Sequence, residues 1–381
     1  MGQQAPISAG WMLAVLAAGF LQGLATLRFL WRLRQDSRAD AENPHSPSVS
    51  VIVPCKGDSP ELRGNLESFL GQDYQGQAEF IFVTPREDDP AHSVALGSLA
   101  AHPRAEARAV CSGAKPLICS EKNLNLLAGV AAARGDSRIL VFADCDLRVE
   151  PSWLSGMVGP LRDPATTAAT AVMLYLPASP GPADWLRLAW LAAALPWFEP
   201  MRLAAGHSLA VRRADFAPLG LEEAWRRGIS DDLSLAQRLR RAGGRVVLAA
   251  RATPASGEGC SFRSLFAHLT RWLTLFRFYD GRVWFLAVAA AGLPCAALIH
   301  ALQGPVQWPL LAAIFASAAP PPALAIAGLR RLRPELFAGA AYRAASVRVL
   351  LAAAALPWLN AAALAASSLR MELHWSGYSY L

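Results

Sequence analysis

The sequence predicts an α/β domain with a mostly parallel sheet, bounded at both ends by apolar helices long enough to cross a membrane. Two observations support this prediction. Between residues 48 and 259, short runs of apolar, β-branched residues alternate with helical patterns, as they do in βαβ units. Longer apolar runs lie on both sides of this region, and each has the length of a bilayer span.

The composition agrees with a membrane-associated protein. Of the 381 residues, 54% are hydrophobic and only 17% are charged, which is more apolar than an ordinary soluble protein. The 36 Lys and Arg residues exceed the 29 Asp and Glu residues, and this excess favours anionic lipid headgroups or an anionic substrate over nucleic acid. The six cysteines lack the spacing of a metal site, so we expect free thiols in a domain that faces the cytosol.

Residues 1–47 are predicted to form a transmembrane signal anchor and a linker. The run from Ile7 to Trp31 contains about 20 apolar residues, enough to span a bilayer, and carries no charge before Arg28. A signal peptide would have its basic residues before the apolar run, whereas here they follow it. By the positive-inside rule, the N-terminus lies outside and the chain from residue 32 onward lies in the cytoplasm.

The region 48–259 is predicted to hold the catalytic domain. In its first half we expect strands at 48–54, 79–83, 107–111 and 138–143, and helices at 61–70, at 91–101 and after Ser120. In its second half we expect a helix at 151–161, strands at 168–176, 208–213 and 245–250, and a helix from Ser230 or Asp231 to Gly243. The apolar helix at 184–198 is too short to span a membrane, so we expect it at an interface or in a core.

Asp144-Cys145-Asp146 comes directly after the fourth predicted strand. In an extended strand alternate side chains share a face, so we expect Asp144 and Asp146 to project together at the carboxyl edge of the sheet, where open α/β sheets bind ligands. Two convergent carboxylates can hold a divalent cation against a diphosphate. A solvated acidic turn is the alternative interpretation.

Further polar residues lie where such a site needs them. Lys56 and Asp89 follow the first two strands, and Lys122 opens a helix; lysines can offset the charge of a pyrophosphate, and a carboxylate can hydrogen-bond a base or ribose. Asp89 precedes Pro90, so it could equally cap a helix, and Lys122 could be a surface residue. Asp232 has the position of a catalytic base at a helix start, although capping of the helix is the alternative interpretation.

Residues 260–282 are predicted to form a basic amphipathic helix at the membrane interface. His268 and Arg271 share a face of it, and binding of lipid phosphate is the simpler reading of this pair. Residues 283–381 contain apolar runs at 284–303, 306–328 and 346–367, which predict about three spans and a tail outside the cell. If the third run, which proline interrupts, were re-entrant, the tail would be cytoplasmic.

Taken together, Asp89, Asp144, Asp232 and His268-x-x-Arg271-Trp272 resemble the signature of the ceramide glucosyltransferase family, three spaced aspartates followed by (Gln/Arg)-x-x-Arg-Trp. That family belongs to the inverting, Rossmann-like GT-A-fold transferases that use nucleotide sugars. The resemblance covers about residues 48–280 and includes three local runs: Lys56-Gly57, Glu67-Ser68-Phe69 and Pro116 to Asn125. Two departures concern the acceptor: His268 replaces Gln or Arg, as in bacterial relatives that act on lipids such as hopanoids, and Asp146 replaces a Gly.

The resemblance implies a role for each of these residues. Asp89 would contact uracil or ribose, Asp144 the ribose or diphosphate, and Asp146 together with Asp144 a divalent metal, Mg²⁺ or Mn²⁺. Asp232 would be the general base, and His268, Arg271 and Trp272 would hold the leaving diphosphate and the acceptor. The remaining donor-site residues would be Lys56, Lys122, Asn125, Gly206 and His207, of which the last two would help to select the sugar.

We therefore expect a multi-pass protein of the bacterial inner membrane whose cytoplasmic domain transfers a glucose-like sugar, with inversion, from a UDP-sugar to the hydroxyl of a membrane lipid such as ceramide or a hopanoid. One alternative is a processive polysaccharide synthase of the cellulose or hyaluronan kind, although such enzymes usually have more spans and a motif that begins with Gln. A second alternative is a membrane scaffold without enzymatic activity, in which the Asp-x-Asp is incidental.

Overall fold

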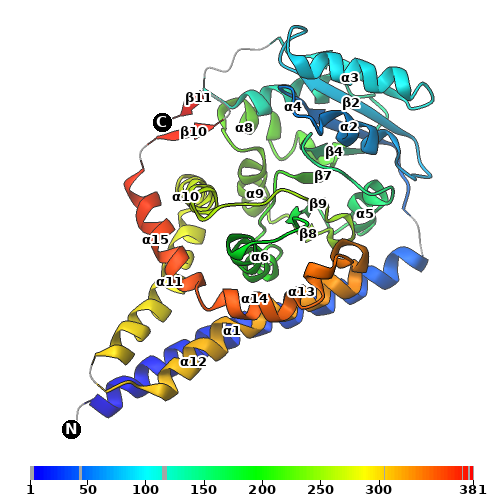
Figure 1. The fold of residues 1–381 in the computed structure, drawn as a ribbon. Helices are drawn as coiled ribbons and strands as arrows, with labels where there is room; N and C mark the ends of the chain where they lie inside the picture. Colours follow the sequence, from blue (N-terminus) through cyan, green and yellow to red (C-terminus); the bar gives the residue numbers. More distant parts are fainter. Residues whose placement is uncertain are drawn as a thin grey trace. The chain divides into compact units, whose positions relative to one another are not determined.

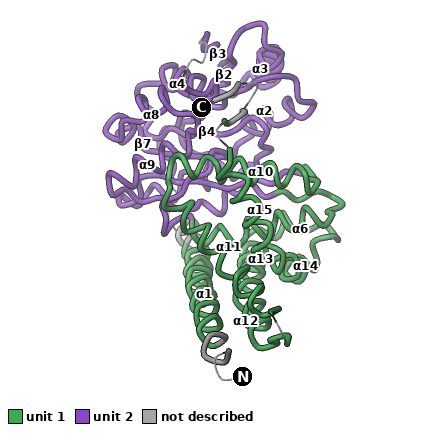
Figure 2. Tube along the Cα trace, turned by 90° about the vertical axis from the view of Figure 1, so that its left-hand side faces the viewer, with its two compact units in different colours: residues 1–35, 175–197, 257–381 green, residues 36–174, 198–256 purple. Residues whose placement is uncertain are grey.

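The computed structural model describes residues 4–42, 45–113, 118–303, 305–370, 372–375 and 378–380. The chain divides into two compact units: unit 1 comprises residues 1–35, 175–197 and 257–381, and unit 2 comprises residues 36–174 and 198–256 (Figure 2). Pro116, at the start of one run that resembles the glucosyltransferase family, lies outside the described residues. All six cysteines are free, as predicted.

Unit 2 is built on a sheet whose described strands lie in the order β3-β2-β1-β4-β7-β5-β8. Their bounds are β1 Val49–Pro54, β2 Ala78–Thr84, β3 Ala107–Cys111, β4 Ile139–Ala143, β5 Ala168–Ala171, β7 Ser208–Arg212 and β8 Val246–Leu248. β7 pairs antiparallel with β4 and β5, and the other neighbours pair in parallel. The predicted α/β class with a mostly parallel sheet is confirmed.

Helices cover both faces of this sheet. Val51, Ile52 and Val53 are consecutive residues of β1 and all are fully buried, which requires cover on both sides because their side chains alternate between faces. The described helices of unit 2 are α2 Leu62–Leu70, α3 Pro90–Ala101, α4 Glu121–Ala132, α5 Trp153–Val158, α7 Arg213–Phe216, α8 Leu221–Arg227 and α9 Asp231–Arg241. One buried cluster joins Leu126 of α4, Trp225 of α8 and Leu239 of α9 to β1, β2 and β4.

Two predicted elements of unit 2 are interrupted. The strand expected at 168–176 ends as β5 at Ala171, and the separate strand β6 Leu174–Tyr175 pairs with β9 Ala255–Ser256 in a two-stranded sheet. The helix expected at 151–161 continues from α5 as the 3₁₀ turn Gly159–Arg162. Pro160 explains this change, because proline has no N–H for the α-helical hydrogen-bond ladder.

The described part of unit 1 is mostly helical, and its strands β10 Leu373–Trp375 and β11 Tyr378–Tyr380 pair antiparallel. Its described helices are α1 Gln4–Glu42 (which runs on past residue 35), α6 Pro182–Ala194, α10 Phe262–Tyr279, α11 Gly281–Leu302, α12 Trp308–Ala318, α13 Pro320–Leu332, α14 Ala345–Ala353 and α15 Leu356–Leu369. Val15 of α1 packs with Ala297 of α11 and Leu310 of α12, and Figure 1 shows α1 beside α12. α6 is a core helix of this unit, since Ala189 and Ala192 are fully buried.

Three described helical segments are long and apolar enough to span a membrane, at Ala9–Gln35, Gly281–Leu302 and Trp308–Leu332. These correspond to the predicted N-terminal anchor and to the first two C-terminal runs. The third C-terminal run forms α14 and α15, which are bent by 56° relative to each other, so it is either a broken span or a re-entrant loop.

Candidate active site

The parallel strands β1, β2 and β4 end at the same edge of the unit 2 sheet. Ile52 of β1 is paired with Phe142 of β4, and Pro54 of β1 with Val83 of β2, so the segments that follow these strands are neighbours. Those segments carry Lys56, Asp89 and Asp144. The carboxyl edge of the sheet thus gathers the charged residues that the sequence placed at the strand ends.

The geometry assumed for Asp144-Cys145-Asp146 is wrong, because these residues do not form an extended strand. β4 ends at Ala143, the Asp144 amide donates to the carbonyl of His207 (3.1 Å), and Cys145 and Asp146 form a turn. The ladder stops there because β7 begins at Ser208, the partner of Ala143. Asp144 is partly exposed and Asp146 is exposed, so both carboxylates remain accessible.

Lys122 is the centre of a group of charges. Its Nζ lies 2.7 Å from Asp144 Oδ1 and 3.2 Å from Asp231 Oδ1, and it donates a longer hydrogen bond to the carbonyl of Gly206 (3.4 Å). Ser120 fixes this position, since its Oγ accepts from the Asn123 amide (3.1 Å) and so caps α4, as predicted. The interpretation of Lys122 as a surface residue is wrong, because its side chain is only 20% exposed.

Burial and charge act in opposite directions on these groups. Burial by itself would lower the pKa of Lys122, but Asp144 and Asp231 together raise it above its ordinary value. Burial raises the pKa of Asp231 to about 7, because the loss of solvent outweighs the attraction of Lys122. Burial also lowers the pKa of His207, which keeps its imidazole neutral at pH 7.

Asp231 and Asp232 are neighbours in sequence but have different surroundings. Ser230 caps α9 by accepting from the Leu233 amide (3.3 Å) and donates to Asp232 Oδ1. Asp232 Oδ1 also accepts from the Leu233 amide (2.7 Å), and Oδ2 accepts from the Gly206 amide (2.9 Å). Asp231 is buried, and its Oδ2 has no hydrogen-bond partner among the described residues. The sequence interpretation gave Asp231 no role in the site. Two consecutive carboxylates at a helix start were the feature that could have indicated one.

Gly206 fits closely between these groups. A Cβ atom at this position would lie 3.1 Å from Lys122 Nζ and 3.3 Å from each carboxylate oxygen of Asp231. The Gly206 backbone meanwhile contacts Lys122 through its carbonyl and Asp232 through its amide. A larger residue here would have to displace the lysine or the carboxylate.

Two of the other predicted donor-site residues of unit 2, Asp89 and Lys56, have defined partners. Asp89 caps α3, as the alternative interpretation held: its Oδ1 accepts from the Ala91 amide (3.0 Å) and also from the Gly57 amide (2.9 Å). Lys56 Nζ lies 2.7 Å from Glu121 Oε1 at the start of α4. Asn125, one turn after Lys122, is buried, and its Oδ1 has no hydrogen-bond partner within the described ranges.

The residues His268, Arg271 and Trp272 lie in unit 1, on α10, whereas the carboxylates belong to unit 2. Arg271 Nη2 and His268 Nδ1 are 3.4 Å apart, and the His268 and Trp272 rings are 5.3 Å apart between centroids. The predicted shared helix face is confirmed. Trp272 also packs edge-to-face on Trp190 of α6 (5.8 Å), which in turn donates to Asn360 Oδ1 of α15 (2.9 Å).

Comparison with known proteins identifies the family. Residues 11–377 match the family model described as glycosyl transferase family 21. The chain belongs to this family. The resemblance to the ceramide glucosyltransferases is thereby confirmed, and the described sheet and apolar helices agree with the predicted α/β domain that has apolar helices at both ends.

Individual relatives of this family 21 glycosyltransferase are more distant. It is 27% identical to ceramide glucosyltransferase 1 of Caenorhabditis elegans over 146 residues, which is 38% of this chain and 30% of that protein. The mannosyltransferase PcManGT of Pyrobaculum calidifontis has a TM-score of 0.49 at 18% identity, over 94% of this chain and 98% of that one. Glucosyl-3-phosphoglycerate synthase of Mycobacterium tuberculosis has a TM-score of 0.41 at 17% identity, over 66% of this chain and 84% of that one.

The residues at the carboxyl edge suit a divalent cation bound together with a diphosphate. Within the described part of the chain, no three His, Cys, Asp or Glu side chains form a metal site by themselves. A Mg²⁺ ion at a sugar diphosphate, however, needs only one or two protein carboxylates, because phosphate oxygens supply the other ligands. Asp144 meets this need: its oxygen already pairs with a cationic group at 2.7 Å, and it is partly exposed.

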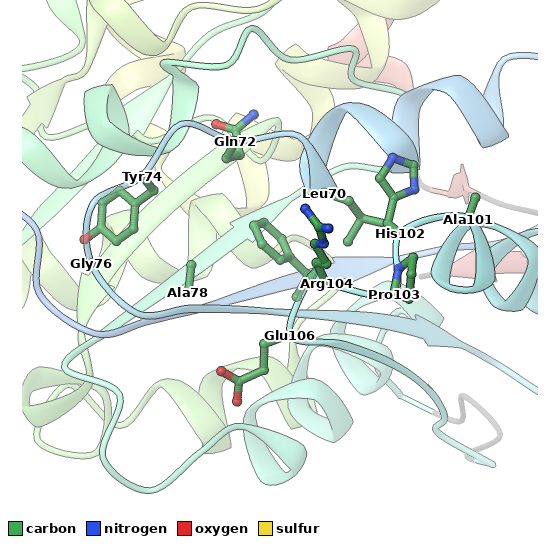
Figure 3. Close-up of a pocket in the computed structure, with 12 residues that line it drawn as sticks. Leu70, Gln72, Tyr74, Gly76, Ala78, Ala101, His102, Pro103, Arg104 and Glu106 are labelled. Atoms are coloured by element: carbon green, nitrogen blue, oxygen red, sulfur yellow. The ribbon is translucent and has the colours of Figure 1, made fainter.

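A cavity of about 550 Å³ lies elsewhere on unit 2 (Figure 3). Its lining includes Ala78 and Phe80, at the amino end of β2, together with Tyr74, His102 and Arg104. Because Asp89 and Asp144 follow the carboxyl ends of strands, this cavity is separate from the candidate active site. None of the predicted site residues lines it.

Proposed function

We propose that this family 21 glycosyltransferase moves a glucose-like sugar from a UDP-sugar to the hydroxyl of a membrane lipid, such as ceramide or a hopanoid, with inversion at the anomeric carbon. The observation that carries the proposal is the convergence of Lys122, Asp144, Asp231 and Asp232 around the Gly206 backbone at the carboxyl edge of the sheet. Membership of a glycosyltransferase family argues against the scaffold interpretation.

On the donor side of the proposed site, positive charges would neutralise the negative charge of the diphosphate. Asp144 and Asp146 would hold Mg²⁺ or Mn²⁺, and the bound cation would neutralise charge on the leaving diphosphate. Lys122 and Lys56 would add positive charge near the same phosphates, and His207 and Gly206 would lie against the sugar. Since Asp89 Oδ1 accepts two backbone amides, we propose that Oδ2 contacts uracil or ribose, and that Asn125 of α4 also contacts the donor.

Asp232 is the proposed general base. It would take the proton of the acceptor hydroxyl while that oxygen attacks the anomeric carbon and the bond from this carbon to UDP breaks. Attack from the face opposite the leaving group converts an α-linked donor into a β-linked product. Hydrogen bonds from Ser230, from Gly206 and from the Leu233 amide fix the orientation of the carboxylate, and this fixed orientation supports the proposal.

We propose that residues of α10 bind the acceptor. Arg271, with His268 and Trp272 on the same face of α10, would hold the leaving diphosphate and the acceptor headgroup. The apolar helices suit a lipid acceptor, and we place the enzyme in a bacterial inner membrane with its catalytic unit in the cytoplasm.

The test is UDP release by the full-length protein in detergent with UDP-glucose and Mn²⁺, with and without ceramide, followed by mass spectrometry of the lipid. We expect lipid-stimulated release and a hexosylated lipid, and Asp232→Asn should reduce turnover by at least about 100-fold while UDP still binds. A variant with near wild-type turnover would remove the base assignment. A product whose length grows with time would instead identify a polysaccharide synthase.

A further inference from the structure

Lys122 already pairs with Asp144, a carboxylate that the proposed function assigns to the metal. Its ammonium lies 2.7 Å from Asp144 Oδ1, in the same kind of charge-assisted contact that a bound cation would make. A divalent cation brought to Asp144 would be repelled by this ammonium, because two positive charges a few ångströms apart interact strongly in a partly buried site. Metal binding and the Lys122–Asp144 contact therefore compete.

Asp231 gives Lys122 a second partner. This carboxylate is 2% exposed, and its Oδ1 lies 3.2 Å from Lys122 Nζ. The Gly206 carbonyl accepts from the same ammonium (3.4 Å). Lys122 can thus release Asp144 and still keep a buried anion and a carbonyl as partners, which lowers the electrostatic cost of that release.

We infer that Lys122 is an exchangeable counter-ion of Asp144, and that Asp231 is the positioning residue that retains Lys122 when Asp144 binds a divalent cation. The inference rests on the proposed function and extends it by giving a role to Asp231. Without Lys122, Asp144 loses the ion-pair partner that it has among the described residues. Without the Asp231 charge, Lys122 has Asp144 as its remaining carboxylate partner at this position and competes with the metal more strongly.

The experiment measures Mn²⁺ binding to the full-length protein in detergent, without nucleotide, from the electron paramagnetic resonance signal of free Mn²⁺ at pH 8. Lys122→Met is expected to tighten Mn²⁺ binding about tenfold, because a positive charge close to the metal site is lost. Asp231→Asn is expected to weaken it several-fold, because a negative charge near the site is lost and because Lys122 then competes more strongly for Asp144. The double variant should resemble Lys122→Met.

Arg245→Met is the matched control. It removes the same charge from an ion pair of similar length, Arg245 Nη1 to Asp163 Oδ2 at 2.7 Å, at a position away from the carboxyl edge. Its Mn²⁺ affinity should equal that of the wild type. A control that tightened binding as much as Lys122→Met would show an effect of net charge alone and would overturn the inference.

The opposite signs of the two single variants separate this role from a structural one, and the double variant separates it from a plain sum of charges. A double variant whose Mn²⁺ affinity lay midway between those of the single variants would overturn the inference. If Lys122→Met and Asp231→Asn both weakened Mn²⁺ binding, or left it unchanged, the exchange would be wrong while lipid-stimulated UDP release could still stand. If lipid-stimulated UDP release were absent in the wild type, the proposed function would fail whatever the variants did with Mn²⁺.

Discussion

At the scale of single residues, the pair Asp231-Asp232 shows how one helix start gives two carboxylates different properties. Consecutive helical residues point about 100° apart around the axis, so the two side chains enter different surroundings. Asp232 remains partly exposed and accepts hydrogen bonds, including one from the Gly206 amide, whereas Asp231 is buried against Lys122. Burial dominates for Asp231 and raises its pKa to about 7.

This raised pKa predicts a pH-dependent stability. Between about pH 4, the ordinary pKa of Asp, and pH 7, folded Asp231 holds a proton that the unfolded chain has released. The unfolded state therefore binds fewer protons, and the contribution of Asp231 to the free energy of unfolding is present at low pH and is lost as the pH rises through 7. Asp231→Asn does not titrate, so its Tm relative to the wild type should rise by about 5 °C between pH 5 and pH 8.

The measurement is thermal unfolding of both proteins in detergent across this pH range. The charged groups acting on Asp231 are Lys122 of α4, Asp232 of α9 and Asp144 after β4, and Asp231→Asn leaves all three in place. A difference in Tm that stayed constant with pH would contradict a raised pKa for Asp231.

At the scale of elements, α4 is the helix that positions Lys122 and Asn125, and Gly129 sets its distance from the sheet. A Cβ atom at Gly129 would lie 2.3 Å from Ile52 Cγ2 and 3.1 Å from Val83 Cγ2, both buried in strands. Gly129→Ala should therefore push α4 outward and lower the free energy of unfolding by about 1–3 kcal/mol. The KM for the donor should rise as well, because Lys122 moves with the helix.

Gly135→Ala is the control for this prediction, since a Cβ atom at Gly135 would have no neighbour within 4 Å. Gly129 lies in the last turn of α4 and Gly135 follows the helix, so both variants add one methyl group near its carboxyl end. Thermal unfolding and donor kinetics should change for Gly129→Ala alone. Equal behaviour of the two variants would show that the helix can adjust without moving Lys122.

The elements themselves could be predicted because their signals are local. Continuous apolar runs predicted β1, β2 and β4, Ser120 predicted the start of α4, and the spacing of His268 and Arg271 predicted a shared face of α10. The turn at Asp144 could not be predicted, since the ladder ends where β7, far along the chain, begins. The contact of Asp231 with Lys122 likewise joins two helices that are far apart in the sequence, so the doubled carboxylate at the start of α9 could not by itself reveal it.

At the scale of the whole molecule, the charges beside the apolar helices indicate how the chain crosses the membrane. Arg28, Arg32 and Arg34 lie near the end of the segment Ala9–Gln35, and Arg330, Arg331 and Arg333 lie at the end of Trp308–Leu332. Basic residues stay on the cytoplasmic side, so both of these ends should be cytoplasmic. The end of Gly281–Leu302 would then lie on the outer side, and the unit 2 residues would lie in the cytoplasm.

Single cysteines in a cysteine-free background test this orientation. Asp88→Cys places a thiol at a side chain that is 76% exposed, on the loop before Asp89, and Gln303→Cys places one directly after α11. A membrane-impermeant maleimide should label Gln303→Cys on intact cells, and Asp88→Cys only after permeabilisation. Labelling of Asp88→Cys on intact cells would put the proposed donor site on the side of the membrane that lacks nucleotide sugars. The assignment of a UDP-sugar as donor would then fail along with the orientation.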